Sequence, residues 1–349
     1  MSDHLEAEGQ YLNPETITQK NKQNIILVTG GSGLVGSTLI KLLLRSGENI
    51  KAIYRQEIPN IEGKENVTWI KADILDVVSL EEAMKDVEYV YHCAAIVSFN
   101  AQRKNELFQT NVAGTANVVN ACLASTVKKF CFVSSVAAFG KSKRNVEINE
   151  KTTWSEASNS SNYGKSKYLA EIEVWRGIAE GLDAVIVNPS IVLGPGDWSK
   201  GSTKIFKTAY EEFQWFTEGV TGFVDVKDVA RAMIQLMNSS IANERFILSG
   251  YNKNYKEVFT MAALAFQKKP PVKKVSRLMA GIVWRAEAVK SLFTNEDPLV
   301  TKETAQAAQE VVYFDNSKLN QFLPSFTYTP FNETIESICL ELKEKNKLK

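Results

Sequence analysis

The sequence predicts an α/β protein built on a doubly wound parallel sheet, with a smaller, mainly helical C-terminal lobe. Apolar, β-branched runs alternate with helical patterns through the first half of the chain, a glycine cluster follows the first run, and helical patterns dominate the second half. Alternating strands and helices favour a parallel sheet covered on both faces. Right-handed crossovers then leave few topologies, of which the doubly wound one is the default.

The elements of the first half follow from this alternation. Strands are expected at residues 25–28, 50–54, 67–71, 87–93, 130–134 and 184–188. Helices are expected directly after the first strand up to residue 44, and at residues 79–85, 102–125 and 161–180. Proline and glycine then mark residues 190–202 as a loop. Beyond it we expect one strand, at 244–248, and helices at 203–216, 226–237, 255–267, 277–293 and 301–311.

This order divides the chain into three parts. Residues 1–24 are polar, lack the apolar segment of a signal peptide, and are interpreted as a loose arm. Residues 25–190 form the sheet domain. Residues 191–349 form mainly a substrate-binding lobe, with some strands and helices returning to the first domain, and the active cleft is expected between the two.

The composition excludes several classes of function. The 41 basic and 40 acidic residues give a net charge of +1, so no electrostatic argument for nucleic acid arises. The four cysteines lack C-x-x-C spacing, which disfavours disulfides and zinc and indicates a reducing, cytoplasmic location. With His4 and His92 as the two histidines, no metal site is expected. No apolar run reaches membrane-spanning length.

The glycine cluster carries the strongest functional signal. Gly31, Gly33 and Gly36 spell G-x-G-x-x-G between a strand and a helix, which is the geometry that directs backbone N–H groups at a phosphate. Gly30 or Gly31 can take the positive φ of the tight turn. The alternative is an ordinary strand-to-helix turn, but these flanks favour dinucleotide binding.

A second signal comes from Tyr163 and Lys167, which stand four residues apart on a predicted helix and therefore share a face. A nearby ammonium should lower the pKa of the phenol, and an oxidised nicotinamide should lower it further. The tyrosine could then exchange a proton with a substrate oxygen. Ser134 and Ser135 lie at the carboxyl tip of a strand, where ligands bind in open α/β sheets. Surface pairing of Tyr163 with Lys167 and turn formation by the serines are the alternatives.

These signals, in this order, resemble the extended short-chain dehydrogenases/reductases of the NAD-dependent epimerase/dehydratase superfamily, which have a Rossmann fold. The resemblance runs from residue 25 to about residue 340. It rests on the motifs TGGSGLVG (29–36), KADILD (71–76), HCAA (92–95), NVAGTANVV (111–119), FVSSVAAFG (132–140), YGKSK (163–167), NPSIVLGPG (188–196) and FVDVKDVARAM (223–233).

The resemblance implies a role for each matching residue. Tyr163 corresponds to the proton donor or acceptor, Lys167 to the residue that tunes it and holds the nicotinamide ribose, and Asn111 to a proton-relay asparagine. Ser135 aligns best with the catalytic serine, and Ser134 is the alternative. His92 is interpreted as a strand residue beside the pyrophosphate. The implied cofactor-binding set is Gly30, Gly33, Leu34, Val35, Gly36, Arg55, Asp73, Ile74, Ala94, Ala95, Lys167 and Pro189.

The end of the second strand bears on the choice of cofactor. Enzymes that use NAD usually place an acid there to hold the ribose 2′-hydroxyl. This chain has Tyr54 followed by Arg55, and a guanidinium can bind a 2′-phosphate in forked fashion. We therefore expect NADP(H), with NAD(H) as the alternative.

Three functions compete on this fold. The first is an oxidoreductase that moves a hydride between nicotinamide and the carbonyl or secondary alcohol of a moderately apolar small molecule. The second is a nucleotide-sugar epimerase or dehydratase, and the third is a silent NAD(P)-binding regulatory protein. Asn188-Pro189 and Arg55 look more like the dihydroflavonol reductase and 3-beta-hydroxysteroid dehydrogenase branch, which favours the first.

Two further expectations concern the second lobe and the assembly. Aromatic side chains gather in and before the segment 203–216 and suit an apolar substrate, although core packing is the more usual role for any single one of them. They are Trp198, Phe206, Phe213, Trp215 and Phe216. The resemblance also implies a homodimer through the helices at 102–125 and 161–180.

Overall fold

The computed structural model describes residues 24–140, 146–155, 161–276, 279, 281, 282, 284, 285, 287 and 301–348. The expected arm at 1–24 therefore lies outside the described residues except for Asn24, and so does most of the expected helix at 277–293.

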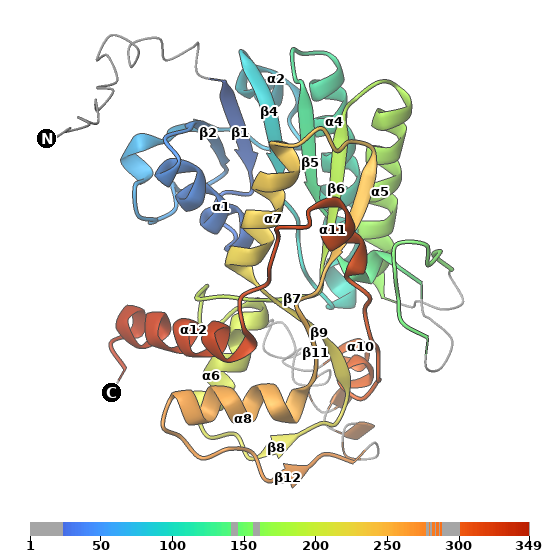
Figure 1. The fold of residues 1–349 in the computed structure, drawn as a ribbon. Coiled ribbons are helices and arrows are strands. Elements are labelled where there is room, and N and C mark those ends of the chain that lie inside the picture. Colours follow the sequence, from blue (N-terminus) through green and yellow to red (C-terminus); the bar gives the residue numbers. More distant parts are fainter. Residues whose placement is uncertain are drawn as a thin grey trace, which may run out of the picture.

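The central sheet has seven parallel strands in the order β10-β6-β5-β4-β1-β2-β3, which confirms the doubly wound fold (Figure 1). The strands are β1 (Ile25–Thr29), β2 (Asn49–Tyr54), β3 (Thr68–Lys71), β4 (Val87–His92), β5 (Lys129–Val133), β6 (Ala184–Pro189) and β10 (Glu244–Leu248). The order reverses between β1 and β4. Ligands bind beyond the carboxyl ends of the strands at such a reversal.

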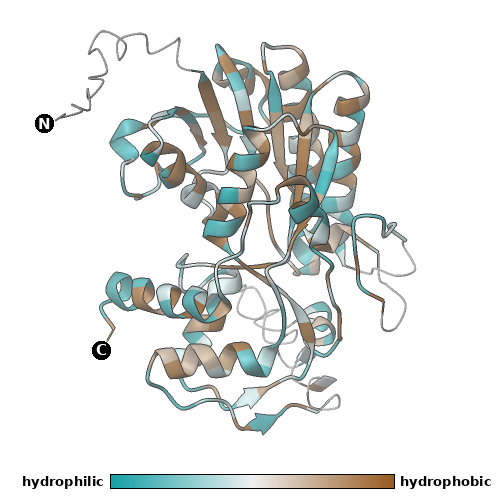
Figure 2. Ribbon diagram, in the orientation of Figure 1, coloured by the Kyte–Doolittle hydropathy of each residue, from teal (hydrophilic) through white to brown (hydrophobic). Residues whose placement is uncertain are grey.

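Helices cover both faces of this sheet. Helices α1 (Leu34–Arg45), α7 (Val226–Met237) and α11 (Ser317–Phe322) bury apolar side chains on one face. Helices α2 (Val77–Ala83), α4 (Gly114–Leu123) and α5 (Asn162–Ala179) do so on the other. Figure 2 shows hydrophobic strands between helices of mixed character, as burial on both faces requires.

The expected helix at 102–125 is helical throughout but changes pitch. A 3-10 turn (Ala101–Arg103) leads into α3 (Lys104–Phe108), then a π-helical turn (Gln109–Ala113), then α4. Single π turns inside α-helices are rare and occur frequently at functional sites. This one contains Asn111.

The second lobe is less helical than expected. Helices α6 (Lys204–Tyr210), α8 (Tyr255–Ala265) and α12 (Phe331–Asn346) share one apolar core. They accompany a three-stranded sheet of β11 (Tyr251–Asn254), β9 (Val220–Asp225) and β7 (Ile191–Leu193), and a pair formed by β12 (Lys273–Lys274) and β8 (Trp215–Phe216). The short helices η6 (Gly201–Thr203) and α10 (Lys302–Ala307) belong to this lobe, whereas η2 (Lys64–Asn66) and η5 (Val136–Ala138) lie in the sheet domain.

Three expectations for this lobe were wrong. The helix at 203–216 ends at Tyr210, because Glu212 adopts a positive φ and residues 215–216 pair as a strand with β12. The helix at 301–311 ends at Ala307, and Val311 instead bridges to Val220. The loop at 190–202 contains β7, which pairs with β9.

Within the described part of the chain, none of the helices combines the length and the apolar character that a membrane crossing requires.

Candidate active site at the carboxyl edge of the sheet

The glycine loop after β1 is shaped by two close approaches, at Gly30 and Gly36. Gly30 has φ +69°, and a Cβ there would lie 2.5 Å from the backbone nitrogen of Ala94. A Cβ on Gly36 would lie 2.3 Å from the carbonyl oxygen of Gly30. The positive φ therefore belongs to Gly30 rather than Gly31. At Gly33 a Cβ would meet one atom within 4 Å, the Gly30 oxygen at 3.3 Å, so this residue faces open space.

The start of α1 fits a dinucleotide pyrophosphate. Gly33 is the N-cap, has extended backbone, and offers no side chain to cap the first turn. That turn begins with Leu34 and Val35 and contains no acidic residue. Free backbone N–H groups at a helix N-terminus, beside an open glycine, make an anion site. The residues present therefore fit the pyrophosphate of a dinucleotide.

The loops after β2, β3 and β4 border this position. Arg55 follows β2 and its guanidinium lies 4.0 Å from the Asp73 carboxylate, with both side chains substantially exposed. The side chain of Ile74 is buried, and a Cβ on Gly114 would touch it, so Ile74 packs against α4. After β4, Ala94 is partly exposed and Ala95 is exposed.

Tyr163 lies in the first turn of α5, where Ser161 caps the helix by accepting from the Gly164 backbone N–H. Its hydroxyl is hydrogen-bonded to Ser135, and its ring meets Phe99 edge-on at 5.6 Å between centroids. The structure thus brings together Tyr163 and Ser135. Ser134 points elsewhere, because its hydroxyl donates to the Glu171 carboxylate at 2.6 Å.

We expected the Lys167 ammonium to lower the pKa of the Tyr163 phenol. This expectation was wrong for the protein without a bound cofactor. Burial raises the pKa of Tyr163, and the hydrogen bond with Ser135 opposes that rise in part. The physical reason is desolvation, which penalises a buried phenolate. The side chain therefore carries its proton at neutral pH.

Lys167 lies one helical turn beyond Tyr163 and is buried. Its ammonium donates to the Val133 carbonyl at 2.7 Å and lies 4.4 Å from the centre of the Phe132 ring. Burial lowers the pKa of Lys167 to about 8, while the Glu171 carboxylate acts in the opposite direction. At neutral pH this ammonium is mostly protonated, so the site contains a buried positive charge.

Asn111 joins the loop after β4 to α5. Its Oδ1 accepts from the Ile96 backbone N–H at 2.8 Å, and its Nδ2 donates to the Ile96 carbonyl at 2.9 Å and the Ser166 hydroxyl at 2.9 Å. Ser166 in turn donates to the Tyr163 carbonyl at 2.8 Å. The side chain of Asn111 therefore holds the segment beside Tyr163 in place.

His92 links the glycine loop to Asn111 through a series of hydrogen bonds in which each donor and acceptor can be assigned. The Thr115 hydroxyl donates to the Asn111 carbonyl at 2.6 Å, so it accepts from His92 Nε2 at 3.0 Å. His92 Nδ1 then accepts from the Thr29 hydroxyl at 2.7 Å, and Thr29 accepts from the Ala94 N–H. Burial lowers the pKa of His92 to about 3, so the ring stays neutral and acts as a fixed connector.

A buried polar network that the sequence analysis missed lies behind Ser135. Glu171 accepts from Ser134 and from Asn188 Nδ2, and pairs with Arg245 at 3.2 Å. Asn188 Nδ2 also donates to the Ser135 carbonyl at 3.1 Å. Glu171 stands four residues after Lys167, a spacing that could have revealed it. Arg245 comes from β10, and no local pattern connects it to this cluster.

The remaining candidate residues are Pro189 and the aromatic side chains that were expected to suit an apolar substrate. Pro189 ends β6 and is buried. Phe206 and Phe216 are buried, Trp198 packs against Tyr210, and Phe213 is 53 % exposed. Phe206 and Trp198 thus belong to the core of the second lobe.

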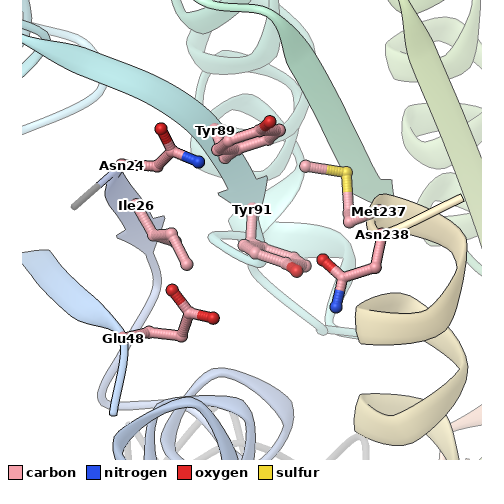
Figure 3. Close-up of a pocket in the computed structure, with 7 residues that line it drawn as sticks. All are labelled: Asn24, Ile26, Glu48, Tyr89, Tyr91, Met237 and Asn238. Carbon is pink, nitrogen blue, oxygen red and sulfur yellow. The ribbon is translucent and has the colours of Figure 1, made fainter. Parts of the chain in front are cut away.

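A cavity of about 90 Å³ lies among Asn24, Ile26, Glu48, Tyr89, Tyr91, Met237 and Asn238 (Figure 3). Asn24 and Ile26 stand at the amino end of β1, and Glu48 directly precedes β2. The cavity is therefore at the edge of the sheet opposite the glycine loop, away from the candidate site.

Known proteins are similar to this chain over most of its length. The chain is 32% identical over 241 residues to cinnamoyl-CoA reductase 1 of Petunia hybrida, covering 64% of this chain and 72% of that protein. It is 29% identical over 272 residues to sterol demethylase protein B of Methylococcus capsulatus, covering 76% and 82%. It is 30% identical over 280 residues to tetraketide alpha-pyrone reductase 2 of Arabidopsis thaliana, covering 72% and 85%.

Solved structures share the fold across the chain. The crystal structure of gox2253 superposes with a TM-score of 0.78 at 28% identity, covering 93% of this chain and 99% of that one. A UDP-glucose 4-epimerase of Thermotoga maritima, solved with UDP-glucose, has a TM-score of 0.74 at 20% identity, covering 92% and 99%.

The family model described as NAD dependent epimerase/dehydratase family matches residues 26–248, which include the glycine loop, Asn111, Ser135 and the Tyr163–Lys167 pair. The resemblance inferred from the motifs is confirmed, and the chain belongs to the NAD dependent epimerase/dehydratase family.

Proposed function

We propose that this protein is an NAD(P)-dependent oxidoreductase that interconverts a carbonyl and a secondary alcohol on a moderately apolar small molecule. The observation that carries the proposal is the cluster of Tyr163, Ser135 and Lys167 at the carboxyl edge of the sheet, next to the pyrophosphate-fitting loop. The reductases among its relatives support the same class of reaction.

Each side chain of the cluster has a chemical role in this proposal. Tyr163 gives its phenolic proton to the carbonyl oxygen during reduction and takes a proton from the alcohol during oxidation. Ser135 donates a hydrogen bond to the same oxygen, and the Lys167 charge stabilises the phenolate that forms. When bound, a nicotinamide cofactor supplies or accepts the hydride. The raised pKa of Tyr163 keeps the proton available, which suits reduction.

The surface beside Tyr163 supports an apolar substrate. Phe99, which contacts the Tyr163 ring, is 36 % exposed, and Val97 is 62 % exposed. Exposed apolar side chains beside polar catalytic groups are typical of small-molecule sites.

For the cofactor, we propose NADP(H), because the exposed Arg55 guanidinium stands at the end of β2. A charge-assisted hydrogen bond to the 2′-phosphate should make NADPH bind at least about tenfold more tightly than NADH. Dissociation constants for both cofactors test this, and Arg55→Ala should remove the difference. Tighter binding of NADH by the unmodified protein would contradict the assignment.

A turnover screen tests the reaction class. NADPH absorbance is followed with ketones, aldehydes, steroids and nucleotide sugars, and we expect consumption with apolar carbonyl compounds. Conversion of a UDP-sugar without net cofactor consumption would instead establish the epimerase alternative.

We place the protein in the cytoplasm, since Cys93, Cys122, Cys131 and Cys339 are free thiols.

A further inference from the structure

Glu171 is a buried carboxylate of α5 whose two oxygens are both held by hydrogen bonds. Its side chain is 2 % exposed. Oε1 accepts from the Ser134 hydroxyl and from Asn188 Nδ2, and Oε2 pairs with the Arg245 guanidinium at 3.2 Å. Ser134 directly follows β5, Asn188 lies on β6 and Arg245 lies on β10. Donors from three neighbouring strands therefore fix the position of this carboxylate.

The Glu171 carboxylate lies next to the Lys167 ammonium. The two residues are four positions apart on α5 and therefore share a face of the helix. The Lys167 ammonium donates to the Val133 carbonyl at 2.7 Å. Glu171 accepts from the hydroxyl of the next residue, Ser134, at 2.6 Å. Both side chains are thus held against consecutive residues at the tip of β5, which places the two opposite charges side by side.

Stability alone does not account for a charge at this position. Taking a carboxylate and a guanidinium out of water costs free energy that their attraction often does not recover, so a buried ion pair is weak evidence of a stabilising role. Arg245 also has other partners, since it donates to the Glu150 carbonyl at 2.6 Å and lies 4.4 Å from the centre of the Phe139 ring. The negative charge of Glu171 therefore calls for a role at the site.

The other titratable groups around Lys167 are uncharged at neutral pH. His92 on β4 has a pKa lowered to about 3, Cys93 after it has a pKa raised to about 12, and burial raises the pKa of Tyr163 on α5. Among the described groups that act on Lys167, Glu171 is the one that is negatively charged in this range, and it opposes the effect of burial on the lysine pKa.

We propose that Glu171 is a positioning residue for carbonyl reduction, which acts through Lys167 as the fixed counter-charge of its buried ammonium. The inference rests on the proposed function, in which that ammonium stabilises the phenolate of Tyr163. Glu171 contacts neither substrate nor cofactor in this scheme, and its effect on the rate passes through the charge on Lys167.

Glu171→Gln tests the charge with little change of shape. The amide oxygen can still accept from Ser134 and Asn188, whereas the negative charge is lost. An opposite charge a few ångströms away changes a pKa by about one unit or more. We therefore expect the titration of Lys167 to move down by about one pH unit, from about pH 8 to about pH 7.

Two measurements follow this titration. NMR of protein containing isotope-labelled lysine reports the Lys167 side chain directly, independently of turnover, and the loss of its signal in Lys167→Met assigns it. The pH profile of kcat/KM, taken with a carbonyl compound that the unmodified protein reduces, reports the same titration in the reaction. We expect both to move down together in Glu171→Gln.

Two further single variants separate charge from shape. Glu173→Gln, on the same helix in an ion pair with Arg176, is the matched control and should leave both titrations unchanged. Glu171→Asp keeps the charge on a shorter side chain, so its titrations should lie closer to those of the unmodified protein than the titrations of Glu171→Gln do.

The double variant Glu171→Gln/Arg245→Gln removes the guanidinium that the single variant leaves without its carboxylate. Neutral replacements for a buried ion pair are often tolerated, so we expect this protein to fold and to show the same downward movement. The movement then cannot come from an unpaired Arg245. Cooperative melting shows which of the variants are folded.

A Lys167 titration that stays at its original pH in either folded variant would overturn the inference and leave Glu171 as a structural ion pair. If the NMR titration moves but the break in kcat/KM does not, the inference fails while the proposed function stands. If the unmodified protein reduces no carbonyl compound, the proposed function fails and the inference fails with it.

Discussion

Lys167 determines how the proposed reaction should depend on pH. Its pKa is lowered to about 8, whereas the neighbouring His92 and Cys93 have pKa values moved to about 3 and about 12 and do not titrate in this range. Lys167 is protonated below its pKa and loses its charge above it. We therefore expect kcat/KM for reduction to be flat up to about pH 8 and to fall above it, by at most about tenfold per pH unit.

The variant Lys167→Met separates this cause from others. Without the ammonium, the rate at neutral pH should drop to the level that the unmodified protein reaches at high pH, and the break near pH 8 should vanish. A break that persists in Lys167→Met would assign the titration to a different group.

At this scale the sequence predicts the position of residues on an element better than their electrostatics. The spacing of Tyr163 and Lys167 predicted that they lie one turn apart on a helix, and both lie on α5. The choice between Ser134 and Ser135 depended on Glu171, a tertiary contact, and the direction of the Tyr163 pKa depended on burial. Neither the contact with Glu171 nor the burial of Tyr163 can be read from the spacing of residues along the chain.

Among the elements, α7 depends on a buried lysine at its C-terminus. Lys129, at the start of β5, is buried and donates to the carbonyls of Leu236 at 2.6 Å and Ser239 at 2.7 Å. A cation that satisfies the last carbonyls of a helix also interacts favourably with its dipole. Lys129→Met removes both hydrogen bonds; the Leu236 carbonyl keeps the Ser239 hydroxyl at 2.8 Å, whereas the Ser239 carbonyl loses the lysine donor. We expect the change to lower the free energy of unfolding by about 1–3 kcal/mol.

The adjacent lysine supplies the control. Lys128 is exposed and pairs with Glu88 at the surface, so Lys128→Met should change the urea midpoint little. Equal midpoints for the two variants would show that Lys129 does not stabilise α7.

Helices and strands were predicted correctly where a hydrophobic pattern extends over many residues. They were missed where short strands pair with strands that are distant in the sequence. The strands of residues 25–188 were all found; they include continuous buried runs such as β6 as well as the partly exposed β3. Strands β8 and β12 have two residues each and pair across more than fifty positions, so no alternation could reveal them. The sheet of β7, β9 and β11 was also missed; these strands have three, six and four residues and pair across about thirty positions.

For the whole molecule, we predict a homodimer through α4 and α5. Isologous dimers are the commonest assembly, and Ile172 on the outer side of α5 is 42 % exposed. Sedimentation should give twice the 38.9 kDa of the chain. Ile172→Lys should shift the species toward monomer while cofactor affinity is retained. A monomer at all concentrations for the unmodified protein would contradict the prediction.

The claim on which the account depends is that Tyr163 moves the proton, and Tyr163→Phe tests it most directly. This change removes the hydroxyl hydrogen-bonded to Ser135 and preserves the ring against Phe99. We expect kcat to fall by about 10²–10⁴-fold, with cofactor dissociation constants within about twofold of the original. Tyr168→Phe, whose ring stacks on Trp154, is the matched control and should turn over normally. Normal turnover by Tyr163→Phe itself would contradict the proposed mechanism.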